Sequence, residues 1–293
     1  MLCALVALAA WYIVRWALLE RGTGSFGDRG PRTGDLLIGF VCNFFDALGI
    51  GNFATTTAIF KLRGRPADEN IPGTLNVGYA LPTVAEALIF IAVVAVDVTT
   101  LVSMIAAAVL GAWLGVGIVG RLSRRAIQLG MGFALFVAAL LMFASNLNWM
   151  PGGGEALGLS GGRLILAIGV NFILGVLMTL GVGLYAPCLI LVCLLGMSPL
   201  AAFPIMMGAC AFLMPIAGTR FVRTGRYDLR ASLGLTLGGI PGVLIAAFIV
   251  KSLPMLWLRW LVVAVVLYAA TLMLLSAHRT RSRAGRVAVP NSL

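Results

Sequence analysis

Two acidic residues lie inside long apolar stretches of the sequence, where a charge is energetically costly and points to a function. Asp46 falls within residues 36–60 and Glu86 within residues 75–96. Each carboxyl group could carry a proton, or it could be a buried structural acid that bonds to the backbone or to Asn76. We treat Asp46 and Glu86 as candidate coupling residues.

A Gly-x-Gly sequence occurs twice, at residues 49–51 and 181–183. Glycine tolerates the backbone of a helix break, and the half-helix after a break would direct free N–H groups and its positive dipole end at the break, which favours an anion. Close helix packing is the other role that such glycines have. The candidate substrate-binding residues are Gly49, Gly51, Asn52, Thr55, Thr56, Asn76, Gly181, Gly183, Tyr185, Pro187 and Cys188.

The two Gly-x-Gly sequences belong to an internal repeat with an offset of 131 to 133 residues. Asp46 and Glu86 have no acidic counterpart, because Met178 and Thr219 stand at the matching positions. Four ordered matches over one copy are hard to obtain by chance between apolar helices. The matches are 48–54 with 180–186, Pro82 with Pro215, Gly111 with Gly242, and 134–142 with 265–273.

The composition is that of an integral membrane protein. Of the 293 residues, 61% are hydrophobic and 11% are charged, whereas soluble domains carry about 25% charged residues. Uncharged stretches at 164–195 and 231–250 reach the roughly 20 residues that cross a bilayer, and they must be helical in lipid. Each copy has four such segments, at 36–60, 75–96, 99–120 and 126–145, and at 164–195, 199–219, 231–250 and 255–276.

The distribution of basic residues indicates how these segments cross. If every segment crosses the membrane once, 13 of the 21 Lys and Arg lie on one side of the membrane and 8 on the other. If the first segment of each copy turns back at its Gly-x-Gly, only Arg163, Lys251 and Arg259 lie on one side and the other 18 lie opposite, as the positive-inside rule prefers. A single long tilted helix is the alternative for each of these segments.

We therefore predict an all-α integral membrane protein with two inverted-topology repeats, each a broken re-entrant helix hairpin plus three transmembrane helices, and one extra N-terminal helix. Residues 1–14 hold no Lys or Arg and no cleavage site follows, so the first helix is expected to be retained. The expected divisions are a 1–19 N-terminal transmembrane helix, a 20–35 cytoplasmic loop, a 36–146 first repeat, a 147–163 extracytoplasmic loop, a 164–276 second repeat and a 277–293 basic cytoplasmic tail.

The sequence offers little for catalysis or metal binding. The five cysteines lie in apolar segments without a C-x-x-C pair, the single histidine is His278, and no catalytic motif or paired nucleophile and base is present. We expect no metal, no cofactor and no enzyme activity; a membrane-embedded enzyme that uses Cys188 is the alternative. Cys188 and Cys210 could touch a soft, sulfur-bearing substrate or be small buried hydrophobes. Three methionines are assigned to core packing, Met206, Met207 and Met214.

These residues resemble the sulfite exporter TauE/SafE family of permeases over about residues 36–276. The resemblance rests on the duplicated unit, the Gly-x-Gly breaks and the basic turn 219–228 that leads into 233–250. It implies transport of sulfur-containing or organic anions such as sulfite, sulfoacetate and thiosulfate. Asn52 and Leu184 depart from it, since the family often has a further glycine at these positions.

The expected function is a secondary transporter for a small anion, a sulfur-containing oxyanion or organosulfonate such as sulfite or sulfoacetate. It would work by alternating access, with the site between two broken-helix tips at the bilayer midplane. The expected location is the cell inner membrane, with the N-terminus outside and the C-terminus cytoplasmic. Its expected partners are the substrate and the lipid bilayer, and no nucleic acid is expected. The sequence does not decide whether the protein forms a homo-oligomer. The alternative is a proton- or cation-coupled carrier of a non-sulfur substrate centred on Asp46 and Glu86.

Overall fold

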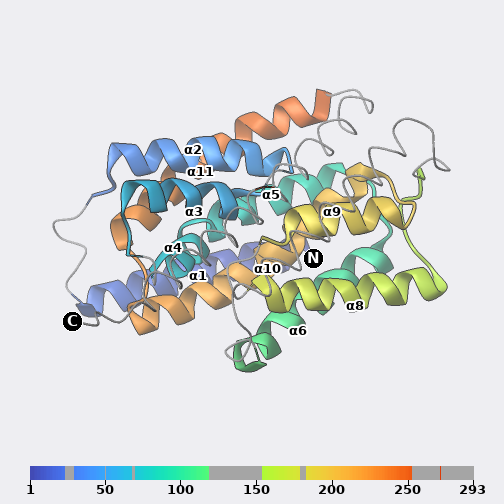
Figure 1. Ribbon diagram of the computed structural model, residues 1–293, viewed down its shortest axis with the longest axis horizontal. Helices are drawn as coiled ribbons and strands as arrows, with labels where there is room; N and C mark the ends of the chain where they lie inside the picture. The colour runs from blue at the N-terminus through green and yellow to red at the C-terminus, as the bar shows by residue number, and fades with distance from the viewer. Residues whose placement is uncertain are drawn as a thin grey trace, which may run out of the picture.

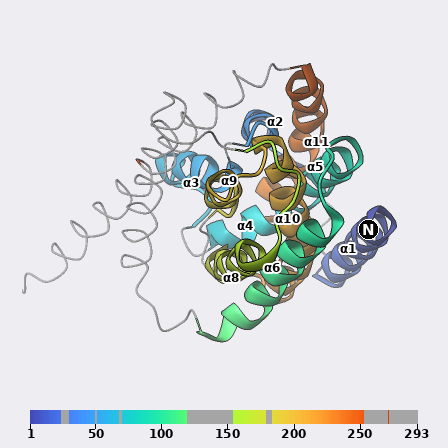
Figure 2. The same cartoon turned by 90° about the vertical axis from the view of Figure 1, so that its right-hand side faces the viewer.

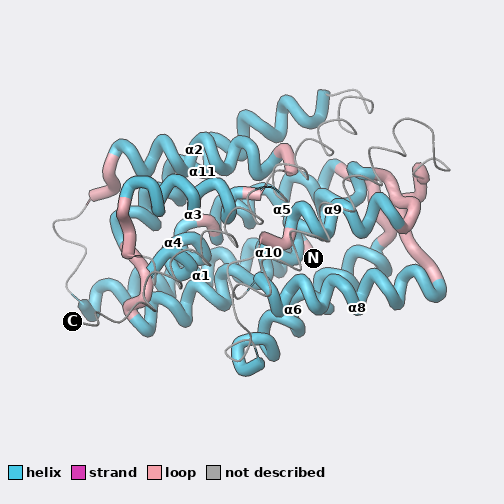
Figure 3. Tube along the Cα trace, in the orientation of Figure 1, coloured by secondary structure: helices cyan, strands magenta, loops and turns pink. Residues whose placement is uncertain are grey.

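The computed structural model describes residues 1–23, 30–49, 51–67, 70–118, 154–178, 183–252 and Thr271. This part of the chain is all-helical (Figure 3), apart from an isolated bridge between Ala156 and Met197. The helices are α1 (Leu2–Thr23), α2 (Thr33–Ala47), α3 (Asn52–Arg63), α4 (Ile71–Gly78), α5 (Ala80–Val93), α6 (Val98–Ile118), α8 (Gly161–Met178), α9 (Tyr185–Leu194), α10 (Pro199–Thr224) and α11 (Leu229–Ser252).

Four of the described helices are long and apolar enough to cross a membrane, namely α1, α8, α10 and α11. The bent pair of α4 and α5 makes a fifth span by length and composition. Large apolar side chains point outward from these and neighbouring helices, as with Trp113, Ile165 and Phe248, which are 71%, 72% and 78% exposed. Such surfaces suit hydrocarbon rather than water, so the prediction of an integral membrane protein is confirmed.

Each segment that contains a Gly-x-Gly is broken, as predicted. The first ends its initial helix at Ala47 and resumes at Asn52, and the second ends at Met178 and resumes at Tyr185. Figure 1 shows α3 running back in the direction opposite to α2, and α9 running opposite to α8. Gly49 and Gly51 have φ values of 93° and 79°, which glycine adopts without the steric cost that other residues have.

The two hairpins are held by equivalent close contacts. Helix α2 packs on α11 and α8 packs on α6, side by side in both views (Figure 2). A Cβ atom on Gly111 of α6 would lie 2.0 Å from the carbonyl oxygen of Phe172 in α8, and one on Gly242 of α11 would lie 2.4 Å from that of Phe40 in α2. Only glycine permits these backbone approaches. Since the repeat offset relates Gly111 to Gly242 and Phe40 to Phe172, the same contact occurs twice.

A pair of aspartates begins the helices that carry these glycines. Asp97 precedes α6, and its Oδ1 accepts hydrogen bonds from the backbone N and the Oγ1 of Thr100, both at 2.8 Å. Asp228 precedes α11, and its Oδ1 accepts a bond from the backbone N of Ala231 at 2.9 Å. Both aspartates satisfy N–H groups that a helix start leaves free. The backbone and hydroxyl bonds from Thr100 hold the pKa of Asp97 below its usual value.

The segment predicted as one helix over 75–96 is instead a bent pair that begins at Ile71. Helices α4 and α5 meet at Tyr79 with a bend of 43°. Pro82 has no N–H for the carbonyl of Gly78 four residues earlier. The hydroxyl of Thr236 in α11 donates to that carbonyl at 2.7 Å, so the bend leaves no unsatisfied group at this position.

Helix α10 lies at the centre of the described structure. It packs against α1, α4, α5, α6 and α9, and most of its residues are buried. The ring of Phe203 stacks on Phe90 of α5 with centroids 5.2 Å apart. Because α10 contacts elements of both copies, it fixes the relative position of the two hairpins.

Helix α1 docks on the outside of this arrangement. Tyr12 donates to the carbonyl of Val77 at 3.0 Å, Trp16 Nε1 donates to the hydroxyl of Tyr227 at 3.2 Å, and that hydroxyl donates to Glu20. The helix continues to Thr23, past the predicted end at residue 19. The predicted segment 126–145 and the tail 277–293 lie outside the described residues, as does the segment 255–276 apart from Thr271.

Candidate functional site

The two helix breaks touch each other inside the molecule. A Cβ atom on Gly51 would lie 3.8 Å from the Cβ of Tyr185, and one on Gly183 would lie 3.9 Å from the Cβ of Phe53. The offset of 132 relates Gly51 to Gly183 and Phe53 to Tyr185, so the two contacts are reciprocal. The breaks therefore meet tip to tip, as the sequence led us to expect for the ends of two half-helices.

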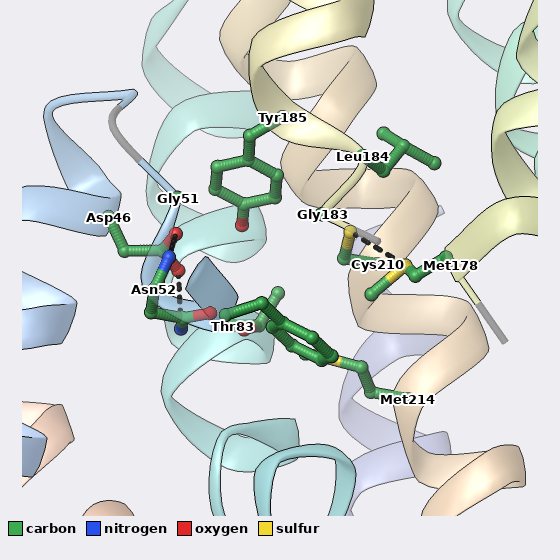
Figure 4. A pocket seen from close by; sticks show the side chains of 11 residues that line it. Asp46, Gly51, Asn52, Thr83, Met178, Gly183, Leu184, Tyr185, Cys210 and Met214 are labelled. Carbon is green, nitrogen blue, oxygen red and sulfur yellow. Dashed lines mark hydrogen bonds between the residues drawn. The ribbon is translucent and has the colours of Figure 1, made fainter. Parts of the chain in front are cut away.

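A small cavity lies where the tips meet (Figure 4). Its volume is about 20 Å³, on the measure by which one water molecule needs about 10–15 Å³. It is too small for an organosulfonate in this conformation. The lining comes from both hairpins and from α5 and α10, and consists of Asp46, Gly51, Asn52, Phe53, Thr83, Met178, Gly183, Leu184, Tyr185, Cys210 and Met214.

The first break carries a carboxylate–amide pair. Asp46 Oδ1 accepts a hydrogen bond from the backbone N of Asn52, and Oδ2 accepts one from Asn52 Nδ2, both at 2.8 Å. Asn52 Nδ2 also donates to Asn43 Oδ1 at 3.1 Å. Asp46 and Asn52 are 2% and 3% exposed. The chain's own carboxylate thus occupies the N-terminal end of α3, where an anion was expected to bind.

The second acid is linked to the second break. Tyr185 in the first turn of α9 donates from its hydroxyl to Glu86 Oε2 at 2.9 Å. Glu86 also interacts electrostatically with Asp46, so the two acids form one cluster. Within the described residues, Glu86 Oε1 and Thr83 Oγ1 are buried without a hydrogen-bond partner. Such groups are costly to bury, and the Thr83 hydroxyl is part of the cavity wall.

The other side of the cavity is apolar and rich in sulfur. The Cys210 thiol donates to the thioether sulfur of Met178 at 3.5 Å, and Met214 follows one turn later on α10 (Figure 4). Met178 stands at the repeat position of Asp46, and Leu184 at that of Asn52. One half of the wall therefore offers polar groups, and the other offers soft, apolar ones.

Comparison with known proteins decides the family. The family described as sulfite exporter TauE/SafE matches residues 1–142 and 164–292, which is nearly the whole chain. The chain belongs to the sulfite exporter TauE/SafE family. No curated protein and no solved structure matches it.

Membership of the TauE/SafE family confirms the resemblance seen in the sequence and makes the protein a membrane transporter. The unmatched residues 143–163 lie between the two copies, so both copies belong to the family's pattern. Within the described residues, no group of three or more His, Cys, Asp or Glu could hold a metal ion, and no Lys or Arg lines the cavity. A bound anion would thus be held by N–H, amide and hydroxyl donors.

Six of the residues singled out from the sequence line the cavity of this TauE/SafE protein. They are Asp46, Gly51, Asn52, Gly183, Tyr185 and Cys210. They include the acid expected to couple, one glycine from each break and the first polar or aromatic residue after each break. Asp46 bonds to Asn52, and not to the alternative partner Asn76.

Other candidates are not among the residues that line the cavity, and they have local hydrogen-bond partners. Thr55 donates back to its own helix, Thr56 shares a 2.5 Å hydrogen bond with Tyr79, and Asn76 Nδ2 donates to the carbonyl of Pro72 at 2.9 Å. These hydrogen bonds give the three side chains partners within the protein itself.

The remaining candidates come from the two breaks. Gly49 packs near Phe203, and Cys188 is fully buried behind the tip of α9. Pro187 lies in the first turn of α9, as predicted. Gly181 lies outside the described residues.

Several lining residues escaped prediction from the sequence. Phe53 and Met178 are the repeat counterparts of Tyr185 and Asp46, so the offset could have found them. Met214 was assigned to core packing but lines the cavity, because its place depends on which face of α10 turns to the tips. Leu184 is likewise the repeat counterpart of Asn52, whereas Thr83 carried no signal beyond its proximity to Glu86.

Proposed function

We propose that this TauE/SafE protein is a secondary transporter of a small anion, with a sulfur-containing oxyanion or organosulfonate such as sulfite or sulfoacetate as substrate. The observation that carries the proposal is the meeting of two broken-helix tips at a small cavity with polar donors on one side. Broken helices that meet inside the membrane recur as substrate sites in transporters. Family membership supports an anion of the sulfite type.

The proposed architecture is a pair of inverted repeats with the site at the bilayer midplane. It is supported by the reciprocal contacts of Gly51 with Tyr185 and Gly183 with Phe53. It is also supported by α2 and α8, which run in opposite directions along the long axis in Figure 1. The distribution of Lys and Arg supports an inner-membrane protein with the N-terminus outside and the C-terminus cytoplasmic.

The proposed mechanism is alternating access. The cavity of about 20 Å³ takes little more than water, so a sulfonate enters only after the tips separate. The negative head would accept hydrogen bonds from the Asn52 amide and the Thr83 and Tyr185 hydroxyls, while an apolar part would lie against Met178 and Met214. Asp46 and Glu86 would couple transport to protons.

A second candidate is a proton- or cation-coupled carrier of a non-sulfur substrate. It is favoured by one observation: Asp46 lines the cavity, and within the described residues no basic side chain does. A buried carboxylate without a basic partner is a natural cation ligand. Substitution of both acids, Asp46→Asn with Glu86→Gln, separates the candidates, because it abolishes cation binding but leaves an anion site with its donors.

The test is thermal unfolding of the detergent-purified protein with sulfite, sulfoacetate, thiosulfate, sulfate, chloride, acetate and simple cations. A ligand that binds only the folded state raises the Tm by mass action. We expect a selective shift with a sulfur anion, lost in Asn52→Ala and retained in Ser103→Ala, whose hydroxyl bonds to its own helix. Shifts with cations alone would overturn the anion proposal in favour of the second candidate.

A further inference from the structure

The carboxylate of Asp46 occupies the place in which a substrate anion would be expected. Its two oxygens take the backbone N–H and the side-chain amide of Asn52 at the start of the 12-residue helix α3. These are the donors that a helix start and an adjacent amide offer to an anion. A substrate that used them would have to displace Asp46.

Among the described residues, no positively charged group surrounds Asp46 that would fix it in this place. The titratable groups that interact with it come from α2, α9, α10 and the bent pair α4 and α5, and none of them in the described part of the chain is basic. They are Cys42, Tyr79, Glu86, Tyr185 and Cys210. Hydrogen bonds and the end of α3 are therefore what stabilises the charge, and a proton on the carboxyl group would remove most of that attraction.

Two further polar atoms at the site have no hydrogen-bond partner among the described residues: a hydroxyl that can donate and a carboxyl oxygen that can take a proton. The Thr83 hydroxyl is fully buried in the cavity wall, with no hydrogen-bond partner among the described residues. Glu86 Oε1 is buried without a partner in the same part of the structure, while Oε2 accepts the Tyr185 hydroxyl. Two adjacent buried carboxyl groups do not both stay ionised, so this cluster has a place for a proton.

We propose that Asp46 is a built-in competitor of the substrate: its carboxylate holds the Asn52 donors in the empty site, and a proton taken up by Asp46 itself releases them to the substrate anion. The inference rests on the proposed function and adds how proton and anion are coupled. One proton forms an O–H bond with the Asp46 carboxylate, directly or through Glu86. The backbone and amide N–H groups of Asn52 then turn to the incoming anion, and Thr83 adds its hydroxyl.

The charge of the site is the same before and after this exchange for a monoanion. One carboxylate charge is neutralised as one substrate charge arrives, so the buried site never holds an additional charge. Proton and anion must then move in the same direction, one for one. An Asp46 side chain that cannot ionise would leave the Asn52 donors free at every pH.

The experiment measures the affinity of the full-length, detergent-purified protein for sulfoacetate and methanesulfonate between about pH 6 and about pH 8, where these ligands keep a constant charge. One proton taken up with each anion weakens wild-type binding about tenfold for each unit of rising pH. Asp46→Asn keeps the size of the side chain and is expected to bind with an affinity that does not change with pH. Asp35→Asn, an acid at the other end of α2, is the matched control and keeps the wild-type dependence.

A second measurement uses wild-type protein in liposomes and does not depend on the folding of a variant. A pH-sensitive dye inside the vesicles should report acidification as methanesulfonate, a monoanion, enters. Anion binding that is constant with pH in the wild type, anion entry without proton movement, or a pH dependence retained in Asp46→Asn would overturn the competitor role and leave the transporter intact. If neither anion binds at any pH, the proposed function itself fails.

Discussion

The two helix breaks share a backbone plan and differ in their side chains. At the first, Asp46 and Asn52 form a hydrogen-bonded pair; at the second, Met178 and Leu184 stand at the same repeat positions. The glycine contacts between the tips are reciprocal to within 0.1 Å, at 3.8 and 3.9 Å. The comparison shows that both breaks have the same backbone contacts, whereas only the first break carries a charged side chain.

This difference gives the cavity two unlike ends. A site with an acid at both tips would hold two like charges without a basic side chain among its lining residues, and such a pair is unfavourable when buried. With an acid at one tip and sulfur at the other, the site suits an anion that has a charged head and a less polar remainder.

The largest effect is expected from giving the second break the charge of the first. In Met178→Asp, a buried carboxylate lies beside Cys210 without an amide partner, since Leu184 replaces the asparagine. A buried unpaired charge costs several kcal/mol. Anion uptake into proteoliposomes should fall by about a hundredfold or more. Met178→Leu keeps the apolar volume and should retain uptake, and equal uptake by both variants would contradict the asymmetry.

A smaller effect is expected from the glycines of the two tips. Gly51 has φ of 79°, whereas φ of Gly183 lies outside the left-handed region. Gly51→Ala should lower the free energy of unfolding by about 1–2 kcal/mol. Gly183→Ala should change it by less than about 0.5 kcal/mol, because the added methyl group makes an ordinary contact with Phe53. Thermal unfolding of both variants measures the difference, and a larger loss for Gly183→Ala would show that the tips differ in backbone as well.

The smallest effect concerns the aspartates that begin α6 and α11. Because hydrogen bonds from Thr100 lower the pKa of Asp97 in the folded protein, its stabilisation is present above the unfolded pKa of about 3.9. It is lost as the pH falls through the lower folded value. Asp97→Ala should lower the Tm by a constant amount from about pH 8 to about pH 5, and the gap to wild type should narrow below about pH 4. A gap that widens in acid would reverse the assigned direction.

The sequence predicted the helix breaks well because their cause is local. An apolar run too long for the bilayer, with two glycines in it, has few other solutions, and the repeat offset placed the second break from the first. The membrane class followed from composition for the same reason. The bend between α4 and α5 could not be predicted in the same way. Pro82 is visible in the sequence, but the hydroxyl that donates to the Gly78 carbonyl belongs to Thr236, 158 residues away.

The chemistry of the site was predicted less completely. Asp46 and Asn52 were both singled out, yet their pairing depends on how sharply the chain turns between them, and Asn76 seemed an equal partner. The sulfur side was predicted only in part: Cys210 was named as a possible contact for a sulfur-bearing substrate, with a buried hydrophobe as the alternative, whereas Met214 was assigned to the core of an apolar helix. Only the packing of α10 against both tips distinguishes them.

The contacts of Gly111 and Gly242 show how the two copies depend on each other. Each joins a helix of one copy to a helix of the other, α6 with α8 and α11 with α2. A single copy would therefore leave both of its glycine surfaces uncovered, and a second copy closes them together. This mutual exchange is the geometry of a twofold-symmetric dimer. Because the two copies are on one chain, this pairing needs no second molecule to bury the two glycine surfaces.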